Sequence, residues 1–292
     1  MPRTIHTVLF QDKTLLAAAL ELDDSTARIE VQCLLQHVLG VARAYLLAHP
    51  ERILNETEEA HYQALLQRRK DGEPIAYIFG EREFYGLSLG VTPDTLIPRA
   101  DTELLVELVL QSLPPVSSMK EARCSMRVLD MGTGSGAIAL SVAHQRPDVE
   151  VWSCDASVAA LDVARSNAQR LNISTVSFVE SNWFSALNGQ RFDIIVSNPP
   201  YIAADDHHLS QGDVRFEPLS ALASGPDGLD DIRHIVAQAG AHLEVNGWLM
   251  LEHGYDQAAR VRELLQASGF VAVFSVKDLS GIERCSGGQF LA

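Results

Sequence analysis

The chain has 292 residues, with 38 acidic and 23 basic side chains and a formal net charge of −15. The hydrophobic fraction of 47% excludes a disordered chain, and the negative charge disfavours a protein that binds DNA or RNA by neutralising many phosphates. At roughly 150 residues per domain, the length predicts about two domains.

Residues 1–13 do not pair a basic segment with a long apolar one, so we expect no signal peptide. Charges break the apolar stretches well short of the ~20 residues that a membrane helix needs. The cysteines are far apart and irregularly spaced, which is typical of reduced thiols in a cytoplasmic protein and not of a zinc site. They are Cys33, Cys124, Cys154 and Cys285.

Residues 11–71 predict three or four short helices with short connections, which is typical of a small helical bundle. Apolar residues recur at helical spacing in 15–20 and in 29–39, and the second run ends at Gly40, a common helix terminator. A third helix is predicted from Glu56 to Arg69, with acidic residues in its first turn.

Pro74 ends this helical pattern, and residues 83–91 predict a hairpin of two short strands. Residues 92–99 are irregular. Asp101 is expected to cap a helix that runs to about residue 111, and residues 113–118 are expected to form a loop.

From residue 126 on, strands and helices alternate, which predicts an α/β domain with a mainly parallel sheet and helices on both faces. Strands are expected at 126–131, 150–154, 176–179, 193–197, 248–251 and 271–276, with a candidate last strand at 289–291. Helices are expected at 137–144, 157–171, 230–243 and 257–268.

Three glycines, Gly132, Gly134 and Gly136, follow the first of these strands and open the next helix. Glycine lets the backbone turn sharply and approach a ligand closely, and the helix start offers free N–H groups. We therefore expect a nucleotide-type ligand there and regard a merely tight turn as the weaker alternative. The spacing alone fits either NAD or S-adenosylmethionine.

Asp155 ends the next strand, about 20 residues after the glycine loop. A carboxylate at that place can accept both hydroxyls of an adenosine ribose. The alternative interpretation is a cap for the helix predicted at 157–171.

A second motif, Asn198-Pro199-Pro200-Tyr201, ends the strand at 193–197. Its prolines remove backbone donors and stiffen the chain at the carboxyl edge of the sheet, where α/β folds bind ligands. The Asn198 side-chain oxygen and the Pro199 carbonyl can accept both N–H bonds of a planar amide or exocyclic amine, and Tyr201 can lie against the flat group. Because these contacts orient a poor nucleophile for methyl transfer, they favour S-adenosylmethionine over NAD.

Taken together, these motifs resemble those of the protein glutamine N5-methyltransferases, and more narrowly the HemK/PrmC family of peptide chain release factor glutamine methyltransferases. The resemblance spans nearly the whole chain and includes residues 68–75, 82–87, 95–103, 182–184, 211–218 and 251–254. Its most specific segments are Ile-Pro-Arg at 97–99 and Arg-Phe-Glu-Pro at 215–218.

The resemblance implies a Rossmann-like class I S-adenosylmethionine-dependent methyltransferase domain at 101–292, a β-hairpin linker at 76–100 and a helical bundle at 1–75 that recognises the substrate. The implied substrate is the glutamine of the Gly-Gly-Gln motif in peptide chain release factors, whose methylation serves translation termination.

The resemblance also assigns parts of the cofactor to residues. The ribose goes to Asp155 and the adenine pocket to Trp183, for which an ordinary core aromatic is the alternative. The methionine part goes to the glycine loop, which consists of Gly132, Thr133, Gly134, Ser135 and Gly136.

The substrate amide is assigned to Asn198, Pro199, Pro200 and Tyr201, with catalytic roles for Asn198, Pro199 and Tyr201. Asn198 is also expected to face the cofactor. Arg99 and Glu103 are expected to shape the site without a catalytic role.

Three local features depart from the pattern or invite another interpretation. Ala100 stands where the family often has proline, and we expect little effect. Gly287-Gly288-Gln289 copies the substrate motif; we interpret it as coincidence and keep an intramolecular pseudo-substrate as the alternative. His207 and His208 are expected to point apart with no third ligand, so we predict a solvated loop and no metal.

Four alternative functions remain open. One is a glutamine methyltransferase acting on a ribosomal protein. A nucleic-acid adenine N6-methyltransferase needs a flipped base and usually a basic recognition region, which this acidic chain does not offer. A nicotinamide oxidoreductase has no use for Asn-Pro-Pro-Tyr, and a silent binding protein would retain only the fold. We expect a monomer that acts on a protein, with no nucleic acid and no membrane.

Overall fold

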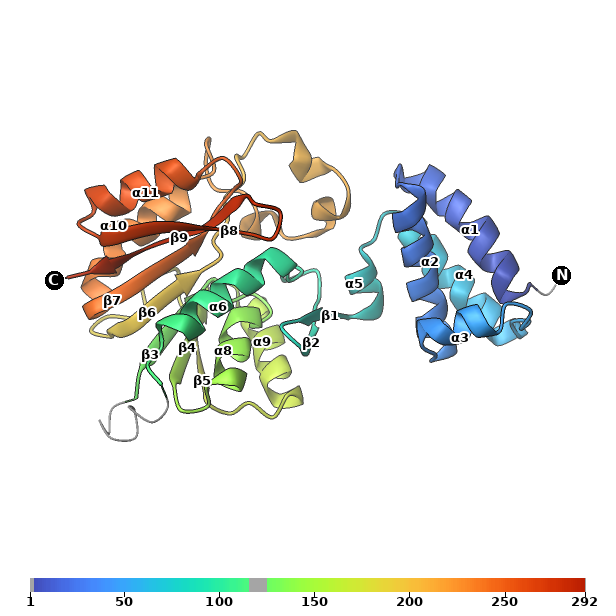
Figure 1. Cartoon of the computed structure of the whole chain (residues 1–292), viewed down its shortest axis with the longest axis horizontal. Helices are drawn as coiled ribbons and strands as arrows, with labels where there is room; N and C mark the ends of the chain where they lie inside the picture. Colours follow the sequence, from blue (N-terminus) through green and yellow to red (C-terminus); the bar gives the residue numbers. More distant parts are fainter. Residues whose placement is uncertain (1–2, 116–124, 292) are drawn as a thin grey trace. The chain divides into compact units, whose positions relative to one another are not determined.

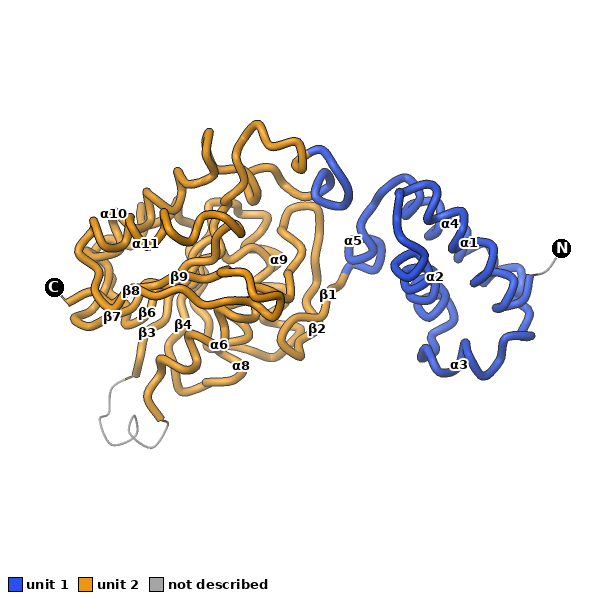
Figure 2. Tube along the Cα trace, turned by 45° about the horizontal axis from the view of Figure 1, so that its top comes forward, with its two compact units in different colours: residues 1–80, 210–216 blue, residues 81–209, 217–292 orange. Residues whose placement is uncertain are grey.

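The computed structural model describes residues 3–115 and 125–291 and divides into two compact units (Figure 2). One unit comprises residues 1–80 and 210–216, and the other comprises residues 81–209 and 217–292. Cys124 and the last part of the loop expected at 113–118 lie outside the described residues. Cys33, Cys154 and Cys285 are free thiols, as expected.

The first unit is a helical bundle with an apolar core. Its helices are α1 (Ile5–Leu20), α2 (Asp24–Leu39), α3 (Arg43–Ala48), α4 (Glu56–Lys70) and α5 (Ile75–Phe79). The predicted stop at Gly40 is confirmed, since this residue ends α2 in the left-handed conformation. Helix α4 begins with a reciprocal capping box between Asn55 and Glu58.

Two helix boundaries differ from the prediction. Helix α1 begins at Ile5, ahead of residue 11, because the Thr4 hydroxyl accepts a hydrogen bond from the Thr7 N–H and caps it. The short helix α5 was not predicted. It follows Pro74 directly, and a proline at a helix start costs nothing because the N–H it lacks has no partner there.

The second unit contains a two-stranded hairpin and a seven-stranded sheet (Figure 1). The hairpin strands β1 (Glu81–Phe84) and β2 (Leu87–Gly90) are antiparallel and begin two residues earlier than predicted. The sheet has the order β5-β4-β3-β6-β7-β9-β8. Its strands are β3 (Arg127–Met131), β4 (Glu150–Asp155), β5 (Val176–Glu180), β6 (Phe192–Ser197), β7 (Leu243–Glu252), β8 (Val271–Lys277) and β9 (Glu283–Phe290).

The mainly parallel sheet is confirmed, because the neighbours from β5 to β7 all pair in parallel. Strand β9 is antiparallel to both β7 and β8 and is longer than the candidate strand at 289–291. Five helices of the described residues accompany the sheet: α6 (Glu103–Ser112), α8 (Ala137–Gln145), α9 (Val158–Arg170), α10 (Asp230–His242) and α11 (Ala258–Ala267).

Alternate residues of the central strands feed two apolar cores, one on each face of the sheet. Val128 packs in the core that contains α6 and α8, whereas Leu129 packs in the core that contains α10 and α11. These helix pairs lie on opposite sides of the sheet (Figure 1). The sheet is therefore covered on both faces, and its strand ends are left to carry the site.

The prediction that Asp101 caps α6 is wrong. A 3-10 turn, Ala100–Thr102, precedes the helix, and Thr102 takes the cap position without a side-chain cap bond. The Asp101 carboxylate lies 3.6 Å from the Arg284 Nε instead.

The C-terminal Gly-Gly-Gln segment is part of strand β9. A Cβ at Gly287 would lie 2.7 Å from the Leu249 carbonyl oxygen, and one at Gly288 would lie 2.9 Å from the Phe270 Cβ. The Gln289 side chain donates to the Asn246 carbonyl at 3.0 Å. Close packing therefore accounts for both glycines, which favours coincidence over a pseudo-substrate.

Within the described ranges 3–115 and 125–291, we find no helix with both the length and the apolarity that crossing a bilayer requires.

Candidate active site

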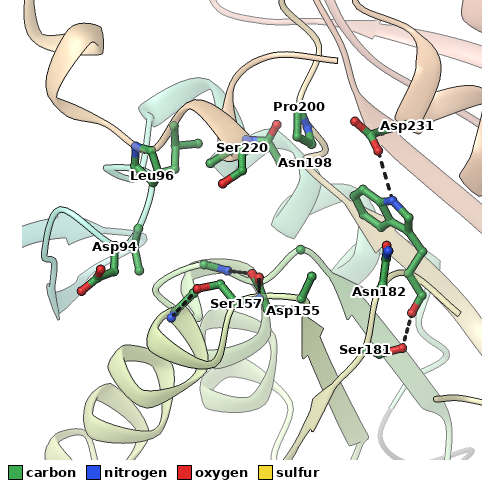
Figure 3. A pocket seen from close by; sticks show the side chains of 18 of the residues that line it. Asp94, Leu96, Asp155, Ser157, Ser181, Asn182, Asn198, Pro200, Ser220 and Asp231 are labelled. Atoms are coloured by element: carbon green, nitrogen blue, oxygen red, sulfur yellow. Dashed lines mark hydrogen bonds between the residues drawn. The ribbon is translucent and has the colours of Figure 1, made fainter. Parts of the chain in front are cut away.

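A cavity of about 360 Å³ lies at the carboxyl ends of the parallel strands (Figure 3). The chain proceeds from β3 to β4 and β5 on one side and from β6 to β7 on the other, so the direction of winding switches between β3 and β6. Doubly wound sheets bind ligands at this switch point. The cavity lining includes Gly132, Asp155, Trp183 and Asn198, which come from four different strand ends.

The glycine loop divides into residues that line the cavity and residues that support it. Gly132 and Gly134 line it, and both have positive φ, at 69° and 55°. A Cβ at Gly134 would meet nothing within 4 Å. Thr133 and Ser135 are buried and do not line the cavity. The Thr133 hydroxyl donates to the Asp130 Oδ2 at 2.6 Å.

Gly136 does not line the cavity either. It is the N-cap of α8 with φ 85°, and a Cβ there would lie 3.0 Å from the Leu140 side chain. This glycine allows the helix to pack closely, so its contribution to ligand binding would be indirect.

Asp155 lines the cavity and is held by two backbone amides. Its Oδ2 accepts from the Gly134 N–H at 2.9 Å, and its Oδ1 accepts from the Ser157 N–H at 2.9 Å. The cap of α9 is Ser157, whose hydroxyl accepts from the Ala160 N–H, so the interpretation of Asp155 as the cap is wrong. A carboxylate has about four acceptor positions, so acceptor capacity remains for ligand hydroxyls.

Trp183 combines the two interpretations that the sequence left open. Its partly buried ring packs against the core on the α10 side and also lines the cavity. Its indole N–H donates to the Asp231 Oδ1 at 3.1 Å (Figure 3). The backbone has φ 51°, and the Trp183 carbonyl accepts from the Ser181 hydroxyl at 2.7 Å. The ring is therefore fixed at the cavity wall.

Asn198 and Pro200 line the cavity, but Pro199 and Tyr201 do not. The Asn198 Nδ2 donates to the Thr102 hydroxyl at 3.1 Å, and its Oδ1 makes no hydrogen bond within the described part of the chain. The Tyr201 hydroxyl donates to the Glu252 Oε1 at 3.2 Å. Burial and the Glu252 carboxyl raise the pKa of the Tyr201 phenol.

An ion pair joins the two most specific segments of the sequence. The Arg99 guanidinium pairs with Glu217, whose side chain is fully buried. The Glu217 Oε2 also accepts from the Ile97 N–H at 2.9 Å. The cavity-lining residues Leu96 and Pro218 adjoin these residues in sequence. Arg99 therefore acts in the scaffold of the site.

Glu103 also acts in the scaffold. Its Oε1 accepts from the Tyr85 N–H at 3.0 Å, and Glu103 does not line the cavity.

The cavity is electrostatically negative. Asp94, Asp155 and Asp231 line it, and no Lys, Arg or His of the described residues does so. Such a site attracts a cation and disfavours the two phosphates of a dinucleotide. Asp130 lies behind the glycine loop, where burial raises its pKa to about 7.

Several lining residues were not predicted. Pro93 and Asp94 were expected only to be irregular, Thr95 and Leu96 were assigned no place in the site, and Ser220, Ala221 and Asp231 carried no signal in the sequence. Ser220 and Ala221 reach the cavity because the long connection after Tyr201 folds back, with the Tyr201 and Ile202 N–H groups donating to the Leu222 carbonyl. Only the tertiary fold brings these segments to the strand ends.

The expectation that His207 and His208 point apart is wrong. Their rings lie 4.0 Å apart, and the Asp206 carboxylate accepts from the His208 Nδ1 at 2.8 Å. Potential ligand atoms of these three residues lie within 4.8 Å of one another. Both histidines are exposed, and the predicted solvated loop agrees with their exposure.

Two family models match the chain. One, described as methyltransferase small domain, matches residues 107–214, and one described as PrmC N-terminal domain matches residues 14–80.

Proteins with the printed name release factor glutamine methyltransferase are similar over nearly the whole length. The one from Xylella fastidiosa is 50% identical over 275 residues, which cover 94% of this chain and 96% of that protein. The one from Burkholderia pseudomallei is 51% identical over 280 residues, with 94% of each covered. The one from Escherichia coli K12 is 47% identical over 263 residues, which cover 90% of this chain and 92% of that protein.

Solved structures support the fold. A methyltransferase from Pyrococcus furiosus matches with a TM-score of 0.52 and 20% identity, covering 80% of this chain and all of that one. A 16S rRNA N2 G1207 methyltransferase from T. thermophilus, solved with AdoMet and guanosine, matches with a TM-score of 0.51 and 21% identity. It covers 72% of this chain and 49% of that chain.

Proposed function

Because this chain belongs to the release factor glutamine methyltransferase family, we propose that it methylates N5 of the glutamine in the Gly-Gly-Gln motif of peptide chain release factors, with S-adenosylmethionine as methyl donor. The observation that supports this most is the side chain of Asn198. It lines an acidic cavity that Asp155 also lines, and its Oδ1 is uncommitted in the described part of the chain.

The cavity residues fit S-adenosylmethionine. The donor carries a positive sulfonium and a positive ammonium group, which match the carboxylates of Asp94, Asp155 and Asp231. We assign the ribose hydroxyls to Asp155 and the adenine to the wall formed by Trp183. The space beside Gly134 is open, since a Cβ there would meet nothing within 4 Å. A glycine at this position leaves that space to the methionine part, which can approach the backbone closely.

The supporting residues of the glycine loop receive a narrower role in this proposal. Thr133, Ser135 and Gly136 shape the loop that holds the methionine part. Pro199 contributes through its backbone carbonyl, and Tyr201 through its fixed ring.

When bound, S-adenosylmethionine supplies an electrophilic methyl group. The Asn198 Oδ1 and the Pro199 carbonyl accept the two N–H bonds of the glutamine amide and turn its nitrogen toward that methyl group. The same two oxygens stabilise positive charge that develops on the nitrogen. The methylated nitrogen then loses a proton to water, so no strong base is needed beside it.

Among the alternatives, a ribosomal-protein glutamine methyltransferase would use the same site chemistry, and the substrate alone separates the two. A nucleic-acid adenine methyltransferase is disfavoured by the acidic lining and by the net charge of −15. A nicotinamide oxidoreductase is disfavoured because no cationic side chain of the described residues lines the cavity to hold phosphates.

We also propose that the helical unit recognises the release factor, and that the enzyme works as a cytoplasmic monomer without nucleic acid. The exposed Phe10, Leu15 and Ile29 of this unit support a protein-binding role, because they offer apolar area to a partner. Light scattering of the purified protein tests the monomer.

The test of the proposed function is transfer of a labelled methyl group from S-adenosylmethionine to a purified release factor. We expect label in the factor and thermal stabilisation of the enzyme by S-adenosylmethionine. Stabilisation by NAD alone, or a release factor that stays unlabelled, would contradict the proposal.

A further inference from the structure

A hydrogen bond to Thr102 fixes the orientation of the Asn198 side-chain amide. Its Nδ2 donates to the hydroxyl of Thr102, a residue that is 5% exposed. A rotated amide would present NH₂ to the cavity instead of oxygen. The substrate amide also offers N–H groups, so two donors would then face each other.

The Thr102 hydroxyl has a single proton, and the neighbouring Glu252 carboxyl can accept a hydrogen bond from it. A hydroxyl group that accepts a hydrogen bond from the Asn198 Nδ2 can still donate its own proton to another acceptor. The Thr102 hydroxyl interacts with the Glu252 carboxyl and favours its charged form, although the Oε2 atom has no hydrogen-bond partner among the described residues. The Tyr201 hydroxyl donates to the Oε1 atom of the same carboxyl.

Glu252 is 1% exposed, and burial raises its pKa to about 7. Several charged or titratable groups face it. Arg284 on β9 favours its charged form, whereas Asp101 in the turn before α6 disfavours it. Tyr201 and Cys285 also face it, and burial together with the Glu252 charge raises the pKa of the Cys285 thiol.

We infer that Thr102 and Glu252 are positioning residues for the reaction, and that they set the direction of a hydrogen-bond chain that ends at Asn198. The Glu252 carboxylate accepts a hydrogen bond from the Thr102 hydroxyl, Thr102 accepts one from the Asn198 Nδ2, and the Asn198 Oδ1 is thereby presented to the substrate amide. This inference rests on the proposed function. It assigns a role to the strand end of β7, which carries Glu252.

The test compares methyl transfer to a purified release factor by the full-length wild type and by the variants T102V, T102S and E252Q. T102V keeps the shape of Thr102 without a hydroxyl, and T102S restores the hydroxyl. E252Q leaves one acceptor oxygen for two hydroxyls and adds a donor. We expect T102V and E252Q to lower kcat about tenfold or more, with T102S close to wild type.

A change in the pH profile separates positioning from a merely structural role. Wild-type kcat should fall as the pH drops through about 7, because a protonated Glu252 carboxyl is a weaker acceptor for the Thr102 hydroxyl. E252Q should lack this acid limb. The matched control is S141A, which removes a buried hydroxyl in α8 that has no hydrogen-bond partner in residues 3–115 and 125–291 and should keep wild-type kinetics.

The dissociation constant of S-adenosylmethionine and the thermal midpoint complete the measurement. We expect both to stay near wild type in T102V and T102S. Wild-type kcat in T102V and E252Q would overturn the inference, and so would an acid limb that persists in E252Q. Losses of kcat that merely follow losses of stability and cofactor binding would overturn it too. An inactive wild type would contradict the proposed function itself.

Discussion

Asn198 and Asp155 line one cavity but have different neighbours and different proposed tasks. Asp155 is tied to the glycine loop by the Gly134 N–H, and we assign its carboxylate to cofactor binding. Asn198 is tied to Thr102, on the side of the Glu252 carboxyl, and we assign its oxygen to the substrate. The two should therefore affect different kinetic constants when they are changed.

Replacing Asn198 by alanine tests this division. We expect Asn198→Ala to lower kcat about 10²-fold or more, because one preorganised contact to developing charge is lost. The affinity for S-adenosylmethionine, measured by calorimetry, should change little. Near-normal turnover of release factor in this variant would contradict the role of Asn198.

The pH dependence of stability tests the environment of Asp130. Burial raises its pKa to about 7, so the folded state binds a proton that the unfolded state releases near pH 4. The contribution of the protonated Asp130 to the free energy of unfolding is complete below pH ~4 and is lost as the pH rises through ~7.

In Asp130→Asn, the slope of unfolding free energy against pH between 4 and 7 should become less negative, by up to about 1.4 kcal/mol per pH unit. Urea unfolding at several pH values measures this slope. An identical slope in wild type and variant would show that Asp130 does not titrate in that window.

At the scale of elements, the sequence predicted what local chemistry decides. Residues close in sequence decide three of these features: the glycine that ends α2, the acidic first turn of α4 and the strand–loop–helix around Gly132. The alternation after residue 126 predicted the parallel sheet. Boundaries were less accurate where a cap or tertiary packing decides them, as at Thr4 and in β9.

Site residues could be predicted where a motif lies at a strand end. They could not be predicted where tertiary contacts bring a distant segment to the cavity. Asp155 and Asn198 follow strands and were expected at the cavity. Asp94 and Asp231 come from a loop and a helix start, and no local pattern indicates that tertiary contacts bring them there. Glu252 was within a recognised segment, but its contact with Tyr201 depends on the pairing of strands.

Arg69 in α4 offers a test of how the helical unit holds the segment 210–216. Its side chain is 3% exposed and pairs with Glu30 at 2.7 Å and with Asp213 at 2.8 Å. Removing one partner of a buried ion pair typically costs about 3–5 kcal/mol. We expect Arg69→Met to destabilise the helical unit by that order, as measured by denaturant unfolding.

The adjacent residue provides a matched control. Arg68 pairs with Glu73, and its side chain is 44% exposed, so Arg68→Met should cost less than about 1 kcal/mol. Equal losses in the two variants would show that burial of the Arg69 pair is not what stabilises this unit.

At the scale of the whole molecule, the charge of −15 first served only to disfavour nucleic acid. The structure adds that three carboxylates line the cavity without a cationic side chain from the described residues. Negative charge is therefore present where a cationic methyl donor would bind, and it agrees with a protein substrate.

The proposed role of the helical unit predicts a difference between two substrates. A whole release factor can contact this unit, whereas a short peptide containing Gly-Gly-Gln can fill only the cavity. We expect kcat/KM to be at least about 10²-fold lower for the peptide, since remote binding energy is lost. Equal kcat/KM values would mean that the helical unit contributes nothing to recognition.

The position of the transferred methyl group tests the proposed methylation of the release factor. Release factor is incubated with enzyme and isotopically labelled S-adenosylmethionine, and its peptides are sequenced by tandem mass spectrometry. We expect one labelled methyl group on the side-chain nitrogen of the glutamine in Gly-Gly-Gln. A methyl group on any other residue of the factor, or a factor left unmodified while a ribosomal protein is methylated, would contradict it.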